Sequence, residues 1–437
     1  MMNKELKSML YAKAQTGRRE YVSELLDILD GDWAEILEDE VDKLFLPQNA
    51  DKLRPRIDTS INVLKQAASQ IACIYSRTVT RTLDESEDPF EVFDSLDLAF
   101  DAADKKMFVC KEVFIRPLYD ADRNKMTVDL LTPNHAWALP DPLDPLGLSM
   151  LVYQRGDEYV LWTADRYEVY DHQFDRIIDR ENPNGENPFG VIPWVCLHDS
   201  FPSDGQVFHE GESEQLRQAT VAAGIQKTDL NHIQHLQSFK QLVGTGIDKN
   251  EKFEQIVDPS VMMSFERGDA SVSVLDMQAD VKNLLDTLLE SSAITLNQMG
   301  IRPEMTRGTL SAQSGYALKI QTHNRERQWE MRRTLWRSYE QRFYDVARQV
   351  WQFFTGLQLP EGTVQVQYQP LGVGANLSEE VTTYSTAVNS SLISRRSAMM
   401  KLWNMTEDEA EAEIEQMQKE EVQLMPPLVP TLDGGSE

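Results

Sequence analysis

The chain has 437 residues, 41% of them apolar, and eight Trp, which suffices for about two to four domains with apolar cores. A formal net charge of −28 disfavours non-specific binding to DNA or anionic membranes, because contact with phosphates requires clustered cations. No stretch approaches the ~20 apolar residues of a membrane span, and the N-terminus holds no apolar run typical of a signal peptide. The cysteines, Cys73, Cys110 and Cys196, are odd in number and far apart, which indicates reduced thiols in an intracellular protein.

The first hundred residues are predicted to be mostly helical. Their apolar residues recur at steps of three and four, which places them on one face of a helix. Ile61, Leu64 and Ala68 form part of such a face. The predicted helices are Asn3–Leu29, Trp33–Leu46, Ile57–Ser76 and Asp84–Asp104.

From Phe108 the apolar period changes to two, which is typical of strands with one buried face. We therefore expect an antiparallel sheet interrupted by turns at its prolines, among them Pro140. The predicted strands are Val109–Ile115, Thr127–Leu131, Ser149–Arg155, Tyr159–Thr163, Tyr167–Asp171 and, after a turn-rich linker, Val191–Leu197.

The second half of the chain returns to helical patterns with two interruptions. Val243–Leu275 is predicted to form short β pieces, and Gly300–Leu310 a loop. Thr363–Tyr368 alternates as a strand, and the Pro- and Gly-rich tail Met425–Glu437 is predicted to be disordered. The predicted helices here are Gly211–Leu242, Met277–Met299, Ser311–Thr355, Ser378–Ser391 and Ser394–Glu421. The expected fold class is therefore α+β, mainly α.

The predicted helix Ser311–Thr355 is basic, with eight Lys and Arg against four Asp and Glu. If fully helical it is about 68 Å long, so we expect part of it to pack beyond its own subunit. Its aromatic residues alternate with arginines, which is compatible with a base-stacking platform. Steps of three and four instead favour a buried face, with the arginines opposite acidic neighbours. That predicted face is Met331, Leu335, Phe343, Val346, Val350 and Phe354.

Few residues form patterns that carry chemistry. The sequence contains no phosphate-binding GxxxxGK[ST] loop, so ATP hydrolysis through such a loop is not expected. Asp229, His232 and His235 offer metal ligands on one helix, but positions i and i+6 share a face poorly and a solvated or interface pair is favoured. Asp141 and Asp144 are explained by turn chemistry before proline. We therefore expect no metal and no cofactor.

The sequence contains, in this order, Asn187–Trp194 (NPFGVIPW), Val257–Leu275, and Leu392–Ala398 followed by Glu409–Glu421. These strings and their order resemble phage portal proteins, the rings at the capsid vertex through which DNA is packaged. Residues Asn187–Trp194 (NPFGVIPW) are similar to the NPFGxIP-type entry before the first stem helix of many portals. Val257–Leu275 resembles the portal clip segment. Leu392–Ala398, followed by the glutamate-rich Glu409–Glu421, is similar to the portal C-terminal pattern of a Ser-capped helix and an acidic one.

The resemblance spans nearly the whole chain and implies a portal-type subunit with a long helix across the wing. The implied regions are a wing of helices and antiparallel sheet at 1–211, stem helix 1 at 212–242, the clip at 243–276, stem helix 2 at 277–299, a tunnel loop at 300–310, a long wing helix and return strand at 311–375, and a crown with a flexible tail at 376–437.

The resemblance also implies a function that is not enzymatic. Portals form a homo-oligomeric ring, usually of twelve, that passes double-stranded DNA during packaging and ejection. Implied partners are the terminase large subunit, the major capsid protein and a head-completion or tail adaptor, with no membrane. The implied location of the protein is the portal vertex of the virion, and the implied site of its synthesis is the host cytoplasm. The implied sites are DNA contact by Arg302 and Arg307 of the tunnel loop, and partner docking by Met262, Met263 and Phe265 of the clip.

Two other classes are left open by the residues alone. A metal-dependent hydrolase or nuclease would use the Asp229, His232 and His235 group, and it predicts tight metal binding by a monomer or dimer. A head-completion adaptor would be another acidic scaffold, but it should be shorter and lack the stem–clip–stem order.

Overall fold

A computed structural model describes most of the chain. The described residues are 8, 13–83, 89–180, 182–202, 207–208, 213–238, 241–245, 271–275, 280–301, 315–369, 377–403, 410–411, 413–414 and 416. Two compact units make up the chain: Met1–Thr309 with His323–Gln369, and Leu310–Thr322 with Pro370–Glu437.

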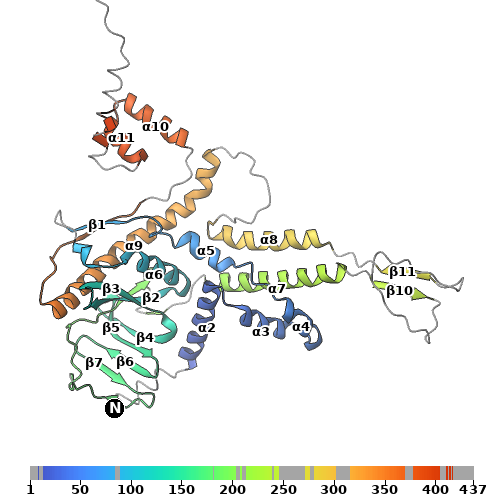
Figure 1. The fold of residues 1–437 in the computed structure, drawn as a ribbon, viewed down its shortest axis with the longest axis horizontal. Coiled ribbons are helices and arrows are strands. Elements are labelled where there is room, and N and C mark those ends of the chain that lie inside the picture. The colour runs from blue at the N-terminus through green and yellow to red at the C-terminus, as the bar shows by residue number, and fades with distance from the viewer. Residues whose placement is uncertain are drawn as a thin grey trace, which may run out of the picture. The chain divides into compact units, whose positions relative to one another are not determined.

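Helices account for much of the described chain (Figure 1). In chain order they are α2 (Lys13–Asp30), α3 (Ala34–Leu44), α4 (Pro47–Leu53), α5 (Val63–Ile71), α6 (Leu96–Cys110), α7 (Ser213–Ser238), α8 (Val281–Gln298), α9 (Gly315–Thr355), α10 (Leu377–Asn389) and α11 (Arg395–Trp403), with single 3-10 turns at Arg54–Arg56, Pro89–Val92 and Pro133–His135.

The strands form antiparallel sheets in the orders β3-β2-β9, β4-β5-β6-β7-β8, β1-β12 and β10-β11. Their bounds are β1 (Thr80–Leu83), β2 (Glu112–Asp120), β3 (Lys125–Leu131), β4 (Ala136–Asp141), β5 (Asp144–Arg155), β6 (Glu158–Trp162), β7 (Tyr167–Tyr170), β8 (Arg176–Ile177), β9 (Val195–His198), β10 (Gln241–Thr245), β11 (Ser271–Leu275) and β12 (Val364–Gln367). Strands β1 and β12 lie almost 300 residues apart in the sequence. Their pairing, with Thr80 opposite Gln367, therefore joins the C-terminal part of the first unit to its N-terminal part. The mixed α+β class is confirmed.

Among the apolar clusters that hold the first unit, two are large. One lies among α2, α5, α6, α7 and α8, and includes the fully buried Leu64 and Trp33. The other lies between the sheets and includes Phe114, Trp162 and Trp194. Burial of such side chains contributes roughly 1.5–3 kcal/mol each to the stability of the fold. The cores therefore fix the positions of the helices and strands that carry the buried charged side chains.

Two predicted helices, observed as α5 and α6, differ from the prediction for local reasons. The predicted helix Ile57–Ser76 begins only at Val63, because the side chain of Asn62 caps it by accepting the Lys65 backbone N–H at 2.8 Å. The predicted helix Asp84–Asp104 is replaced by a 3-10 turn and by α6, since Ser95 takes a left-handed conformation (φ 54°) that a continuing helix cannot contain.

The start of the predicted sheet was also wrong. Val109 and Cys110 belong to the last turn of α6, not to a strand, and the helix ends at Lys111, whose φ is +69°. Both residues and the preceding Phe108 are buried, so this stretch has no polar face from which the period could be read. Pro140 lies inside β4, at a shift in register with β5, where a missing N–H is tolerated.

The second unit contains α10 and α11. The hydroxyl of Ser394 accepts the Ser397 backbone N–H at 3.0 Å, so the predicted Ser cap is confirmed. Arg396 forms an exposed ion pair with Glu411 at 2.5 Å. The predicted helix Ser394–Glu421 is described continuously only as far as Trp403.

Candidate functional site: the anchored long helix

The residues singled out in the predicted tunnel loop and clip lie outside the described part of the chain. These are Arg302 and Arg307 in the loop, and Met262, Met263 and Phe265 in the clip. The described residues instead show how the long helices around them are held.

Helix α7 is seated by small and hydroxyl residues. Gly224 lies so close to α3 that a Cβ atom there would be 2.8 Å from the Trp33 ring. Thr220 accepts the Leu64 N–H at 2.9 Å, and Thr228 accepts the Asp58 N–H at 3.1 Å. These contacts let α7 approach its neighbours closely over about two turns, while α8 packs alongside it (Figure 1).

The His pair of α7 does not resemble a metal centre. His232 is half-buried and His235 is exposed. Burial, and then the nearby cations Arg56 and Lys52, lower the pKa of His232, although Asp229 opposes them. Cations next to a ring nitrogen disfavour a bound divalent ion. Among the residues that the structure describes, no group of three His, Cys, Asp or Glu side chains is placed to hold a metal ion.

The aromatic face of α9 is buried, which supports the core interpretation over the base-stacking platform. The predicted members were partly wrong: Phe343 and Val350 are buried, but Met331 and Phe354 are 61% and 51% exposed. Within the first unit, the buried face of α9 consists of Trp329, Arg332, Trp336, Tyr339, Glu340, Phe343, Tyr344, Ala347, Val350 and Trp351. It therefore includes an arginine and a glutamate in addition to aromatic residues.

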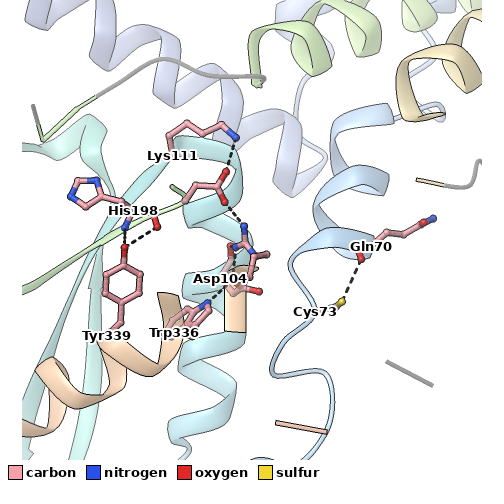
Figure 2. Close-up of polar contacts among 9 residues, drawn as sticks. Gln70, Cys73, Asp104, Lys111, His198, Trp336 and Tyr339 are labelled. Atoms are coloured by element: carbon pink, nitrogen blue, oxygen red, sulfur yellow. Dashed lines mark hydrogen bonds and ion pairs between the residues drawn. The ribbon is translucent and has the colours of Figure 1, made fainter. Parts of the chain in front are cut away.

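Arg332 is the centre of a buried network. Figure 2 labels three of its other members, Asp104, Lys111 and Trp336. The Arg332 guanidinium donates to the carboxylates of Asp104 on α6 and Asp199 after β9. Trp336 Nε1 donates to Asp104 Oδ1 at 2.7 Å, and Lys111 Nζ pairs with Asp199 Oδ2 at 3.0 Å. Two carboxylates are thus shared by two cations, and the network joins α6, α9 and the end of the β2–β9 sheet.

The two carboxylates respond differently to this setting. Burial raises the pKa of Asp104 despite Arg332 and Trp336, and its second oxygen has no hydrogen-bond partner among the described residues. Burial also opposes ionisation of Asp199, but Lys111 and Arg332 together outweigh it and hold the pKa below the usual value. Burial disfavours the charge of Arg332 as well, yet the two carboxylates raise its pKa, so it stays protonated.

Next to this network, Tyr339 fixes α9 to strand β9. Its hydroxyl accepts the backbone N–H of His198 and donates to the carbonyl of the same residue, both at 2.9 Å (Figure 2). One turn of α9 is therefore tied to the sheet through the strand backbone.

Glu340 is the centre of a second buried network on another side of α9. It is 1% exposed and accepts hydrogen bonds from the hydroxyls of Tyr75 at 2.7 Å and Tyr368 at 3.1 Å. Arg81 on β1 pairs with Glu340 and, at 2.6 Å, with Asp97. Because Tyr368 directly follows β12, this network also holds the β1–β12 pair against α9.

Sequence reasoning missed these charged anchors, although signals for them exist. Asp104 is a carboxylate on the apolar face of α6, between Phe100 and Met107. Arg332 and Glu340 occupy positions of the aromatic stripe of α9. A charged residue at a core position of a helix indicates a distant partner of opposite charge. The arrangement fixes α6, α9 and the ends of two sheets in place.

A family model described as "Phage portal protein, SPP1 Gp6-like" matches residues 218–426, from within α7 past α11. Residues 218–426 of this chain are therefore similar to the phage portal protein family. The matched residues include the described part of α9. They therefore include Arg332 and Glu340, the centres of the two buried networks. Among the described residues of this chain, no helix is both long and apolar enough to cross a membrane.

Solved structures show a distant likeness to this chain. "Neck of empty GTA particle computed with C6 symmetry" has a TM-score of 0.46 and 11% identity, covering 82% of this chain and 94% of that one. "Virion of native gene transfer agent (GTA) particle" has a TM-score of 0.43 and 12% identity, covering 82% and 93%. The family assignment rests on the family model. Comparison with curated protein sequences finds no match.

Proposed function

We propose that this portal protein assembles into a closed ring, most simply of twelve copies, at one vertex of a viral capsid. The ring conducts double-stranded DNA during packaging and ejection and is a structural component, with ATP hydrolysis left to the terminase. The observation that carries the proposal is the portal family match over residues 218–426. The chain is made in the host cytoplasm and resides in the virion.

The surface of α8 supports assembly with further copies. Leu284 and Ile294 are 44% and 59% exposed, and the exposed Thr287 and Ser291 between them carry no charge. These residues recur at steps of three and four, so they form one uncharged stripe along the helix. In a chain of net charge −28, such a stripe favours contact with another protein surface over contact with water.

The remaining regions take the roles expected of a portal. Residues 243–276 form the clip that docks the terminase large subunit and the head-completion or tail adaptor, through Met262, Met263 and Phe265. The wing, residues 1–211, contacts the major capsid protein. Replacing Met263 and Phe265 by Ser is expected to leave rings intact and to abolish co-purification with terminase. Loss of the rings in that variant would instead place these side chains between subunits.

The ring itself is tested by negative-stain microscopy and mass photometry of the purified full chain, alone and co-expressed with its capsid protein. We expect closed rings of one stoichiometry, near twelve times 50.0 kDa. Monomers or dimers under both conditions, across protein concentration and salt, would contradict the proposal.

A further inference from the structure

The chain reverses direction at the end of α9 and runs back along the same helix. The reversal occurs at Gly356, whose φ of +71° favours glycine and whose N–H donates to the carbonyl of Gln352 at 2.9 Å. The residues that follow, 357–368, are here called the return segment. They include β12 and end just before the chain enters the second unit at Pro370.

Side chains on one face of α9 bind the backbone of the return segment. The Tyr344 hydroxyl donates to the carbonyl of Pro360 at 2.8 Å, and Gln341 Oε1 accepts the N–H of Val364 at 2.8 Å. One turn after Tyr344, Arg348 Nε donates to a further carbonyl of the segment at 3.2 Å. Because the three helix residues are spaced by three and four, they lie on one face of α9.

The far end of the return segment is held by β1 and by Glu340. Strand β12 pairs with β1 over its whole length, and the hydroxyl of the next residue, Tyr368, donates to Glu340 at 3.1 Å. The segment buries less apolar surface than α9 does, since most of its side chains are exposed or half-buried. Its buried side chains are Leu359, Val364, Val366 and Tyr368.

Release of the return segment would separate no buried ion pair. When Tyr368 leaves Glu340, the carboxylate keeps its pairing with Arg81. Glu361, the charged residue of the segment, has a side chain that is 85% exposed. Displacement of α9 would instead take Arg332 away from its two buried carboxylates. The return segment can therefore open at a lower free-energy cost than the helix that carries it.

We propose that the return segment is a strap that detaches from α9 and β1 as one unit, with Gly356 as its hinge, while Arg332 and Tyr339 keep α9 anchored. Residues 370–437 of the second unit continue directly from this segment. Fully extended, residues 356–369 reach roughly 45 Å at about 3.3 Å per residue, so release lengthens the connection to those residues. The inference concerns contacts within one chain and is independent of the proposed ring.

Hydrogen–deuterium exchange of the full chain, followed by mass spectrometry, tests the strap. Tyr368→Phe removes the hydrogen bond to Glu340, so it is expected to raise the exchange rate of the β12 amides at least about tenfold. The amides of α9 at 336–350 are expected to keep the wild-type rate. The matched control is Tyr339→Phe, which removes a buried hydroxyl that binds β9, and it is expected to leave exchange in β12 unchanged.

Two results of this experiment would overturn the strap. Equal acceleration of β12 and of α9 in Tyr368→Phe would show that the segment and the helix open together. Unchanged exchange in β12 would show that the contact with Glu340 does not hold the segment.

A disulfide across the β1–β12 pair gives a second measurement. Thr82 and Gln365 are opposite one another and exposed, and opposite residues of antiparallel strands lie close enough for a disulfide. The native cysteines are all buried and leave little background. Oxidation of Thr82→Cys combined with Gln365→Cys is expected to slow exchange of the β12 amides at least about tenfold relative to the reduced form. Equal exchange in both forms would show that these amides exchange without detachment from β1, and the proposal would fail.

Discussion

At the scale of residues, Arg332 is held in the core by two carboxylates, and its side chain is only 6% exposed. Replacing it with Met keeps the aliphatic volume but leaves Asp104 and Asp199 buried with less compensation. Removing one partner of a buried ion pair costs about 3–5 kcal/mol, so Arg332→Met should lower the free energy of unfolding by that amount. Urea unfolding measures it. Arg337→Met, at an exposed position of the same helix, is the control, expected within about 0.5 kcal/mol of wild type.

Asp199 should make part of the stability depend on pH. Lys111 and Arg332 hold its folded pKa below the usual value, so its contribution is full above the unfolded pKa of about 3.9 and is lost as pH falls through the folded pKa. Asp199→Asn should therefore be less stable than wild type at pH 7, and this deficit should shrink below about pH 4. Thermal melts from pH 3 to 7 test this, with the exposed Asp157→Asn as control. A deficit that stays constant to pH 3 would refute the ion-pair explanation.

At the scale of elements, Gly224 sets how closely α7 approaches α3. A Cβ atom would meet Trp33 at 2.8 Å and Leu37 at 2.9 Å, so both helices would have to separate. Overpacking of this kind costs about 1–3 kcal/mol, and Gly224→Val should lower the unfolding free energy by that amount. Gly17→Val on α2 is the matched control, because nothing lies within 4 Å of its added Cβ. Equal stability of the two variants would show that α7 shifts without cost.

At the scale of the whole molecule, the charge distribution suits a channel for DNA. The chain carries −28, so the proposed ring would multiply a charge that repels phosphate and discourages adhesion. Arg302 and Arg307 are the cations of the proposed tunnel loop, and a ring of them would contact phosphates without reading bases.

Replacing both loop arginines by Glu should spare folding and ring assembly but lower the packaging or retention of DNA, measured as nuclease-protected DNA per particle. The control changes Arg123 and Arg155, exposed arginines of the first unit, to Glu, which alters the net charge equally. Normal packaging by the loop variant would remove the loop from contact with DNA.

The prediction from sequence was accurate where one element carried its own signal. The helices α2, α7, α8, α9 and α10 were placed to within a few residues at the ends that the structure describes, because apolar steps of three and four are local. Strand β1 was missed and α6 was displaced, because β1 is specified by its partner β12 and the end of α6 is apolar on every side.

The sequence by itself determined the α+β class, the order of elements and the resemblance to portals, since composition, periodicity and short strings are properties of neighbouring residues. The tertiary structure decided which charges are buried. Arg332 meets Asp104 and Asp199 from positions 228 and 133 residues away, and Glu340 meets Arg81 across 259. No local pattern specifies such partners, because a charge enters a core only when folding brings its counter-charge beside it.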